Sequence, residues 1–154
     1  MTTGIRVAAT VSIALATIMA QSCASSVCHV PAERTGIDVM TGAWRIASVR
    51  GEEVAKTLPD GAQEPTLTIN DDGSIAGFAG VNRVSGRVDA KKLAQGVWEA
   101  GPMVSTKMAG PPELMALERE IMLVLESADA ILHTGGSVVL TIEGEEGLAL
   151  MRGE

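Results

Sequence analysis

Short stretches of alternating apolar and polar residues fill most of the chain after residue 40, and they predict antiparallel β-strands. Trp44 and Ile46 alternate with more polar neighbours, and Leu67 and Ile69 alternate with threonines. A period of two places one set of side chains on the buried face of a sheet and the other set on the solvent face. We therefore expect Trp44 to point inward from the first strand.

Turn residues divide the alternating stretches into many short strands. The sequence Asn70-Asp71-Asp72-Gly73 is typical of a hairpin turn, because glycine supplies the positive φ that such a turn needs. The return strand is expected to begin at Ile75 and to run to about residue 80. The other expected strands cover residues 44–49, 52–55, 83–89, 93–98, 130–132, 138–142 and 148–151, with turns at 59–61, 135–136 and 145–147.

One segment has the apolar spacing of an amphipathic helix instead. The positions that form its stripe are Leu114, Leu117, Ile121, Val124, Leu125 and Ala128. Pro111-Pro112-Glu113 suits a first helical turn, so the helix is expected over about residues 111–127. Because such a helix must bury its stripe against a sheet, the sequence predicts an α+β domain: a curved antiparallel sheet or half-barrel of about seven to nine short strands packed on this helix.

Glycine is unusually frequent between residues 73 and 86, around the polar residue Asn82. Glycine inside a strand pattern marks bulges, bends or close approach of another backbone. Gly80 and Gly86 flank Asn82, whose amide either holds a ligand or satisfies backbone groups opened by these glycines. The structural role is favoured. A surface partner or small ligand would sit at residues 77–86.

Glu118 falls beside the apolar stripe of the expected helix. A carboxylate on that face is costly unless it is paired. It is either a functional acid with a raised pKa or a structural residue that pins the helix to the sheet. The pin is favoured, through hydrogen bonds to the glycine-rich segment or to Thr106 or Lys107.

The N-terminal residues have the pattern of an export signal. Residues 1–22 contain one positive charge, an apolar run and small residues before Cys23, as in a secretory signal peptide. Cys23 is then the expected site of lipid acylation, although cleavage after Ser22 without acylation is the alternative. Residues 23–40 are expected to form a flexible linker and residues 41–154 the domain. The expected location is that of a membrane-anchored lipoprotein of a bacterial cell envelope, or of a secreted or periplasmic protein.

Composition excludes several classes of function. The formal net charge is −7 and only three residues are aromatic, so the chain lacks the basic, stacking surface of a nucleic-acid-binding protein. His133 is the one histidine of the expected domain, and no G-x-S-x-G motif occurs, so no catalytic residues are expected. No cysteine and histidine pairs have zinc spacing, and neither a metal site nor a cofactor is expected.

Several motifs, taken in order, resemble the META domain (HslJ-like) family over about residues 42–152. They are Gly42-Ala43-Trp44-Arg45-Ile46 with Gly51, Pro65-Thr66-Leu67-Thr68-Ile69 with Asp72-Gly73 and Gly77, Gly80-Val81-Asn82-Arg83-Val84-Ser85-Gly86, Ser105-Thr106-Lys107-Met108-Ala109-Gly110-Pro111, and Glu118. Val81 and Gly110 replace two cysteines of the family motifs, and Lys107 replaces the usual arginine. Loss of both cysteines together is expected if they normally face each other.

The resemblance implies a small envelope domain without an established enzymatic activity. Members are often lipoproteins associated with heat shock, antibiotic tolerance or virulence. We therefore expect a non-enzymatic, lipid-anchored protein that contributes to stress response or envelope integrity by binding an envelope protein. The alternative is a carrier of a small apolar ligand between sheet and helix, with a cavity lined by Met115, Ile121 and Met122. A hydrolase, the third hypothesis, needs a cleft where His133 meets Ser and Asp.

Overall fold

A computed structural model describes residues 40–134 and 136–153 of the chain. The expected signal segment 1–22, the expected acylation site Cys23 and almost all of the expected linker 23–40 lie outside the described residues. No helix among the described residues is long and apolar enough to cross a membrane.

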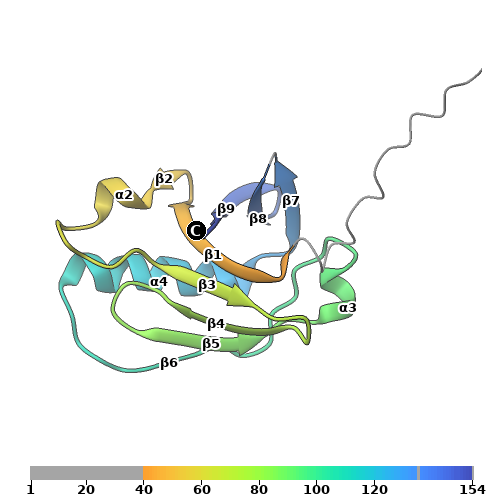
Figure 1. Cartoon of the computed structure of the whole chain (residues 1–154), viewed down its shortest axis with the longest axis horizontal. Coiled ribbons are helices and arrows are strands. Elements are labelled where there is room, and N and C mark those ends of the chain that lie inside the picture. The colour runs from red at the N-terminus through yellow and green to blue at the C-terminus, as the bar shows by residue number, and fades with distance from the viewer. Residues whose placement is uncertain (1–39, 135, 154) are drawn as a thin grey trace, which may run out of the picture. The chain divides into compact units, whose positions relative to one another are not determined.

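The described residues form one open antiparallel sheet of nine strands (Figure 1). The strands are β1 (Gly42–Val49), β2 (Glu52–Glu53), β3 (Thr66–Ile69), β4 (Ser74–Phe78), β5 (Arg83–Arg87), β6 (Val104–Ser105), β7 (Ala130–Thr134), β8 (Ser137–Ile142) and β9 (Glu145–Arg152). Their order in the sheet is β6-β5-β4-β3-β1-β9-β8-β7, and β2 pairs with the end of β1. The expected α+β class is confirmed.

One long helix packs on this sheet. It is α4 (Pro112–Ser127), and it covers one face of the strands in Figure 1. Its stripe residues Leu117, Ile121, Val124 and Leu125 are buried, as the helical spacing predicts. Two single-turn helices, α2 (Val54–Thr57) and α3 (Ala90–Leu93), lie in the connections.

The hydrophobic core lies between α4 and the inward side chains of the strands. These side chains alternate along each strand and include Trp44, Ile46, Leu67, Ile69, Ile75, Leu140, Leu148 and Leu150, each at most 2% exposed. Burying one such side chain contributes about 1.5–3 kcal/mol to folding. The Trp98 indole N–H donates to the backbone oxygen of Leu125 at 2.9 Å, so this core tryptophan also fixes the C-terminal turn of α4.

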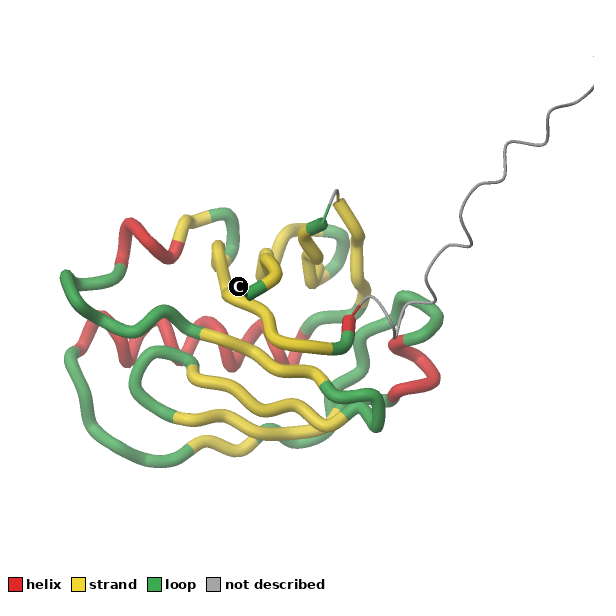
Figure 2. The backbone as a smooth tube through the Cα atoms, viewed as in Figure 1, coloured by secondary structure: helices red, strands yellow, loops and turns green. Residues whose placement is uncertain are grey.

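Strand β1 occupies the middle of the sheet, and it joins two groups of strands that Figure 2 shows on either side of it. It pairs with β3 through Trp44 and Leu67, and with β9 through Trp44 and Arg152. The Arg152 guanidinium donates to the backbone oxygen of Thr41 at 2.7 Å and lies 4.2 Å from the centre of the Trp44 ring. The first and last strands of the described domain are therefore neighbours.

The structure corrects the expected strand at residues 93–98. Leu93 is the last residue of α3 and not the first residue of a strand. The helix begins after Asp89, because the Asp89 side chain caps its N-terminus by accepting hydrogen bonds from the backbone N–H groups of Lys91 and Lys92 at 2.8 and 3.0 Å. Residues 96–101 then connect β7, at one end of the strand order, with β5, next to the other end. Gly96 and Trp98 hydrogen-bond to residues around the start of β7, while residues 99 and 101 hydrogen-bond next to the end of β5.

Two further boundaries were predicted wrongly. The strand expected at 52–55 ends at Glu53, where α2 follows. The turn expected at 145–147 lies instead at Glu143-Gly144, whose φ values are +53° and +84°. Gly147 belongs to β9, and a Cβ there would lie 2.5 Å from a methyl carbon of Val124. This glycine therefore permits close packing of α4 on the strand.

Candidate functional site

The glycine-rich segment connects β4 to β5 beneath the first turn of α4. Gly80 has a φ of +126°, and a Cβ at this position would lie 3.1 Å from the backbone oxygen of Leu114. A larger residue would be strained in this backbone conformation and would crowd the helix. Gly86, in β5, makes room for Met103, whose sulfur would lie 2.1 Å from a Cβ built on the glycine. Both glycines thus permit close packing around residues 77–86.

Asn82 is the centre of a hydrogen-bond network at the end of this segment. Its side-chain oxygen accepts from the Thr106 hydroxyl at 2.8 Å and from the backbone N–H of Met108 at 2.7 Å. Its side-chain nitrogen donates to the backbone oxygen of Met108 at 3.1 Å and to both carboxylate oxygens of Glu118 at 3.0 Å. Asn82 is 1% exposed, so these bonds form in the interior. One amide thereby joins the β4–β5 connection, the segment before α4 and α4 itself.

Glu118 is the carboxylate that this network holds. It is 7% exposed, and one of its oxygens also accepts from the backbone N–H of Asn82 at 2.9 Å. Its side chain forms no ion pair with a described basic residue. The Lys107 side chain is exposed and takes no part in the network among residues 40–134 and 136–153. Glu118 therefore joins α4 to the sheet through Asn82 alone.

The remaining motif residues are dispersed over the fold. Trp44 is 2% exposed, and its indole N–H donates to the backbone oxygen of Met40 at 2.7 Å. Thr106, besides its bond to Asn82, accepts from the backbone N–H of Arg83 at 3.1 Å. Trp44 thus supports the core under β1, whereas Thr106 belongs to the Asn82 network.

Val81 and Gly110, the two positions where the resembled family has cysteine, lie side by side. A Cβ built on Gly110 would be 2.5 Å from Val81 Cγ2 and 3.3 Å from Val81 Cβ. The valine side chain therefore occupies the space that a side chain at position 110 would need. Segments 29 residues apart in sequence meet here, next to the Asn82 network.

A groove of about 790 Å³ crosses the face of β3, β4, β5 and β6 that points away from the core, and we call it the outer groove. The residues that line it are Gln63, Thr66, Thr68, Ala76, Gly77, Phe78, Val81, Arg83, Val84, Ser85, Val104, Ser105, Thr106 and Met108. Thr106 and Met108 are held in place by Asn82. The buried network therefore shapes one wall of an exposed groove.

A second groove, of about 500 Å³, lies between α4 and the end of β1 with α2, and we call it the helix groove. Its buried apolar residues are Val49, Val54 and Leu117. Arg50 and Glu120 form an ion pair at its rim, with 3.1 Å between guanidinium and carboxylate. Neither groove is lined by the residues expected for a carrier cavity, which are Met115, Ile121 and Met122.

Among the described residues, no hydrogen bond joins the His133 side chain to a Ser or Asp side chain, as a hydrolase would need. This histidine is exposed on β7, where it pairs with Val138. Within the described part of the chain, no three His, Cys, Asp or Glu side chains converge as a metal site would require.

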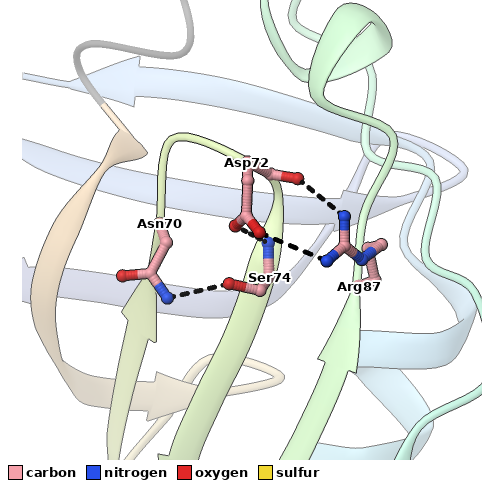
Figure 3. Close-up of polar contacts among 4 residues, drawn as sticks. All are labelled: Asn70, Asp72, Ser74 and Arg87. Atoms are coloured by element: carbon pink, nitrogen blue, oxygen red, sulfur yellow. Dashed lines mark hydrogen bonds and ion pairs between the residues drawn. The ribbon is translucent and has the colours of Figure 1, made fainter.

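A polar cluster stabilises the turn between β3 and β4 (Figure 3). The Asp72 carboxylate accepts from the backbone N–H of Ser74 at 2.8 Å and from the Arg87 guanidinium at 3.2 Å. Asn70 donates to the Ser74 hydroxyl at 2.9 Å. The Ser74 side chain, then its backbone N–H, and to a smaller extent Arg87 hold the pKa of Asp72 below the ordinary aspartate value. The expected turn at residues 70–73 is present.

The lowered pKa of Asp72 predicts an acid-side contribution to stability. Because the folded pKa lies below the unfolded one, this contribution is present above the unfolded pKa and is lost as pH falls through the folded pKa. In a carboxyl-carbon NMR titration, we expect Ser74→Ala to raise the Asp72 midpoint more than Arg87→Gln does. Lys56→Gln, at an exposed position of α2 away from this turn, is the control. Equal midpoints in all four proteins would contradict this assignment.

The outer groove is the feature that the sequence did not reveal. The segment expected to bind a partner, residues 77–86, forms part of it, but the sequence pattern does not single out Gln63 or Val104. The available signal was the polar half of each alternating strand, Thr66 with Thr68 and Arg83 with Ser85. Alternation shows which residues point outward, but not which strands are neighbours.

Comparisons with known proteins agree with this fold. A model of the META domain matches residues 38–154. One protein solved by NMR has a TM-score of 0.58 and 20% identity, over 77% of this chain and 94% of its own. An NMR structure of a protein from Burkholderia xenovorans has a TM-score of 0.53 and 21% identity, over 77% of this chain and 86% of its own. No curated protein matches the chain.

Proposed function

Because this chain belongs to the META domain family, we propose that it is a binding protein of the bacterial cell envelope whose outer groove receives its ligand or partner. The META domain is not a known enzyme family. In this proposal Cys23 carries the lipid anchor, the following residues form the tether, and the domain supports stress tolerance or envelope integrity by binding.

The outer groove, with its wall fixed from inside, is the observation that carries this proposal. Thr106 and Met108 line the groove, and both are bonded to the buried Asn82. Met108 is 57% exposed and Val104 is 61% exposed, although both are apolar. Binding sites commonly combine a preformed concave surface with exposed apolar groups and a few placed polar groups. The Asn82 network provides such preorganisation, which lowers the entropic cost of binding.

Native mass spectrometry of the full chain, extracted gently from its own envelope, tests the proposal. We expect a reproducible adduct, and we expect Val104→Asp, which places a charge in the outer groove, to abolish it. Leu132→Asp is the matched control, because Leu132 is also apolar and exposed but lies on β7, outside the groove. A bare monomer, or an adduct that Val104→Asp leaves intact, would refute binding in this groove. The mass of the mature chain also reports acylation of Cys23.

A carrier of a small apolar ligand is the second candidate, and the helix groove favours it. This groove lies between sheet and helix. Val49, Val54 and Leu117 form its apolar part, and charged residues such as Arg50 and Glu120 line the rest. Ala116 is exposed and lines the same groove, so Ala116→Arg obstructs the groove without removing a core side chain. An adduct that is lost in Ala116→Arg and retained in Val104→Asp would establish the carrier in place of the leading proposal.

A further inference from the structure

The outer groove contains hydrogen-bonding side chains that the fold does not use. The hydroxyls of Thr66, Thr68, Ser85 and Ser105 make no hydrogen bond to another described residue, and neither does the amide of Gln63. Each hydroxyl offers one donor and two acceptor sites. Cross-strand pairing places Thr68, Ala76 and Ser85 in one row across the sheet. These groups are therefore free to bind a ligand that has many donors and acceptors of its own.

The charge of the outer groove differs from that of the chain as a whole. The chain has a net charge of −7, yet no Asp or Glu lines the groove, and Arg83 is its one charged residue. Other arginines near it are neutralised: Arg45 pairs with Glu64 at 3.5 Å, and Arg87 pairs with Asp72 at 3.2 Å. The Arg83 guanidinium has no such partner among the described residues. A guanidinium with free donors binds a carboxylate through two parallel hydrogen bonds.

Apolar surface completes the lining. Phe78 is half-buried in β4 and stands opposite Arg83 in the register of β4 and β5. Val104 and Met108 are exposed in the same groove. The groove thus offers an aromatic ring and two aliphatic side chains beside hydroxyls and one cation. A sugar ring, which has apolar C–H groups as well as hydroxyls, matches both kinds of surface.

We propose that the outer groove binds a saccharide that carries a carboxylate, with Arg83 bound to the carboxylate and the hydroxyls of β3, β5 and β6 bound to the sugar. This inference rests on the proposed function and names its ligand class. An extended peptide, which is bound through a free strand edge, fits less well. Strands β3, β4 and β5 are paired on both sides under the groove, and β6, the end strand, is only two residues long. Binding to an anionic lipid surface needs a cluster of basic residues, whereas the groove contains a single basic residue, Arg83.

The test is an NMR titration of the full chain with trigalacturonic acid, compared with its methyl ester. The ester keeps the rings and hydroxyls but lacks the negative charge. At about 0.15 M salt, long-range charge effects are screened beyond about 8 Å. We expect amide shifts at residues of β3, β4, β5 and β6 with the acid, and binding of the ester weaker by about tenfold, the equivalent of about 1.4 kcal/mol.

Two arginine variants assign the carboxylate to its partner. Arg83→Gln is expected to weaken binding of trigalacturonic acid by about tenfold and to leave binding of the ester unchanged. Arg119→Gln is the control, because Arg119 is an exposed arginine that lines the helix groove instead. Thr68→Val with Ser85→Ala, which removes two hydroxyls of the row, one half-buried and one exposed, should weaken binding of both ligands equally.

The outcomes separate this inference from the function it rests on. Equal binding of the acid and the ester, or equal binding by wild type and Arg83→Gln, would overturn the role of the carboxylate. If neither saccharide binds while the envelope adduct is present and lost in Val104→Asp, the ligand class is wrong and the binding function stands. If no saccharide binds and no adduct is present, both proposals fail.

Discussion

Replacing Asn82 by alanine is expected to lower the free energy of unfolding by about 3–5 kcal/mol. The residue is 1% exposed, and its amide bonds to Thr106, Met108 and Glu118. The substitution leaves the Glu118 carboxylate with the backbone N–H of residue 82 as its one donor among the described residues. It also leaves the backbone N–H of Met108 without its acceptor. Removing one partner from a buried polar network costs more than the bonds themselves contribute, because desolvated groups remain unpaired.

Urea unfolding measures this loss, with Asn70→Ala as the matched control. Asn70 is exposed and makes one side-chain hydrogen bond, to Ser74, so its replacement is expected to cost no more than about 1 kcal/mol. The double variant Asn82→Ala with Glu118→Ala is expected to be more stable than the sum of the single losses implies, by about 1–3 kcal/mol. Equal losses in the Asn82 and Asn70 variants would show that the buried network does not hold helix and sheet together.

Replacing both Val81 and Gly110 by cysteine is expected to produce a disulfide that raises the free energy of unfolding by about 2–4 kcal/mol. A Cβ at position 110 would lie 3.3 Å from the Cβ at position 81, slightly less than the separation of about 3.5–4.5 Å in a disulfide. A small backbone adjustment therefore suffices. The bridge would close a loop of about 30 residues, for which the chain-entropy account gives a gain of about 3.5 kcal/mol.

Single substitutions at these positions separate the bridge from packing. Gly110→Ala alone should destabilise the domain by about 1–3 kcal/mol, because its methyl group overlaps Val81. Val81→Ala together with Gly110→Ala should recover most of that loss. The bridge is measured as the difference between oxidised and reduced protein in urea unfolding, with Cys23 and Cys28 replaced by serine. Two free thiols after oxidation of the folded protein would contradict the expected geometry.

Local periodicity was sufficient to predict most of the fold. Leu67 and Ile69 alternate with threonines because one face of β3 is buried, and the stripe through Leu117 and Ile121 is the buried face of α4. The errors arose where a local signal had two explanations. The sequence context of Gly147 predicts a turn residue, but this glycine lies in β9, where Val124 packs against it. The sequence context of Asp89 predicts a turn, whereas its side chain caps the N-terminus of α3.

The candidate site was harder to predict, because its parts are distant in sequence. Asn82 and Glu118 are 36 residues apart, and nothing local specifies that they meet. The sequence itself marks both residues, Asn82 between glycines and Glu118 beside the apolar stripe, and it favours a bond from Glu118 to the glycine-rich segment without specifying Asn82 as the partner. The outer groove depends on which strands are neighbours. Arg83 became a candidate ligand-binding residue only when the structure showed that it has no acidic partner among the described residues.

The pairing of β1 with β9 has a consequence for how the chain acquires its fold. Trp44 and Arg152 are cross-strand neighbours, although nearly the whole domain separates them in sequence. Until β9 has emerged from the ribosome, β1 lacks its pairing with this strand, and the core side chains Leu148 and Leu150 are missing. Contacts between such distant segments form slowly, since a long loop must close first. The sheet of the domain is therefore complete only after β9 has been synthesised.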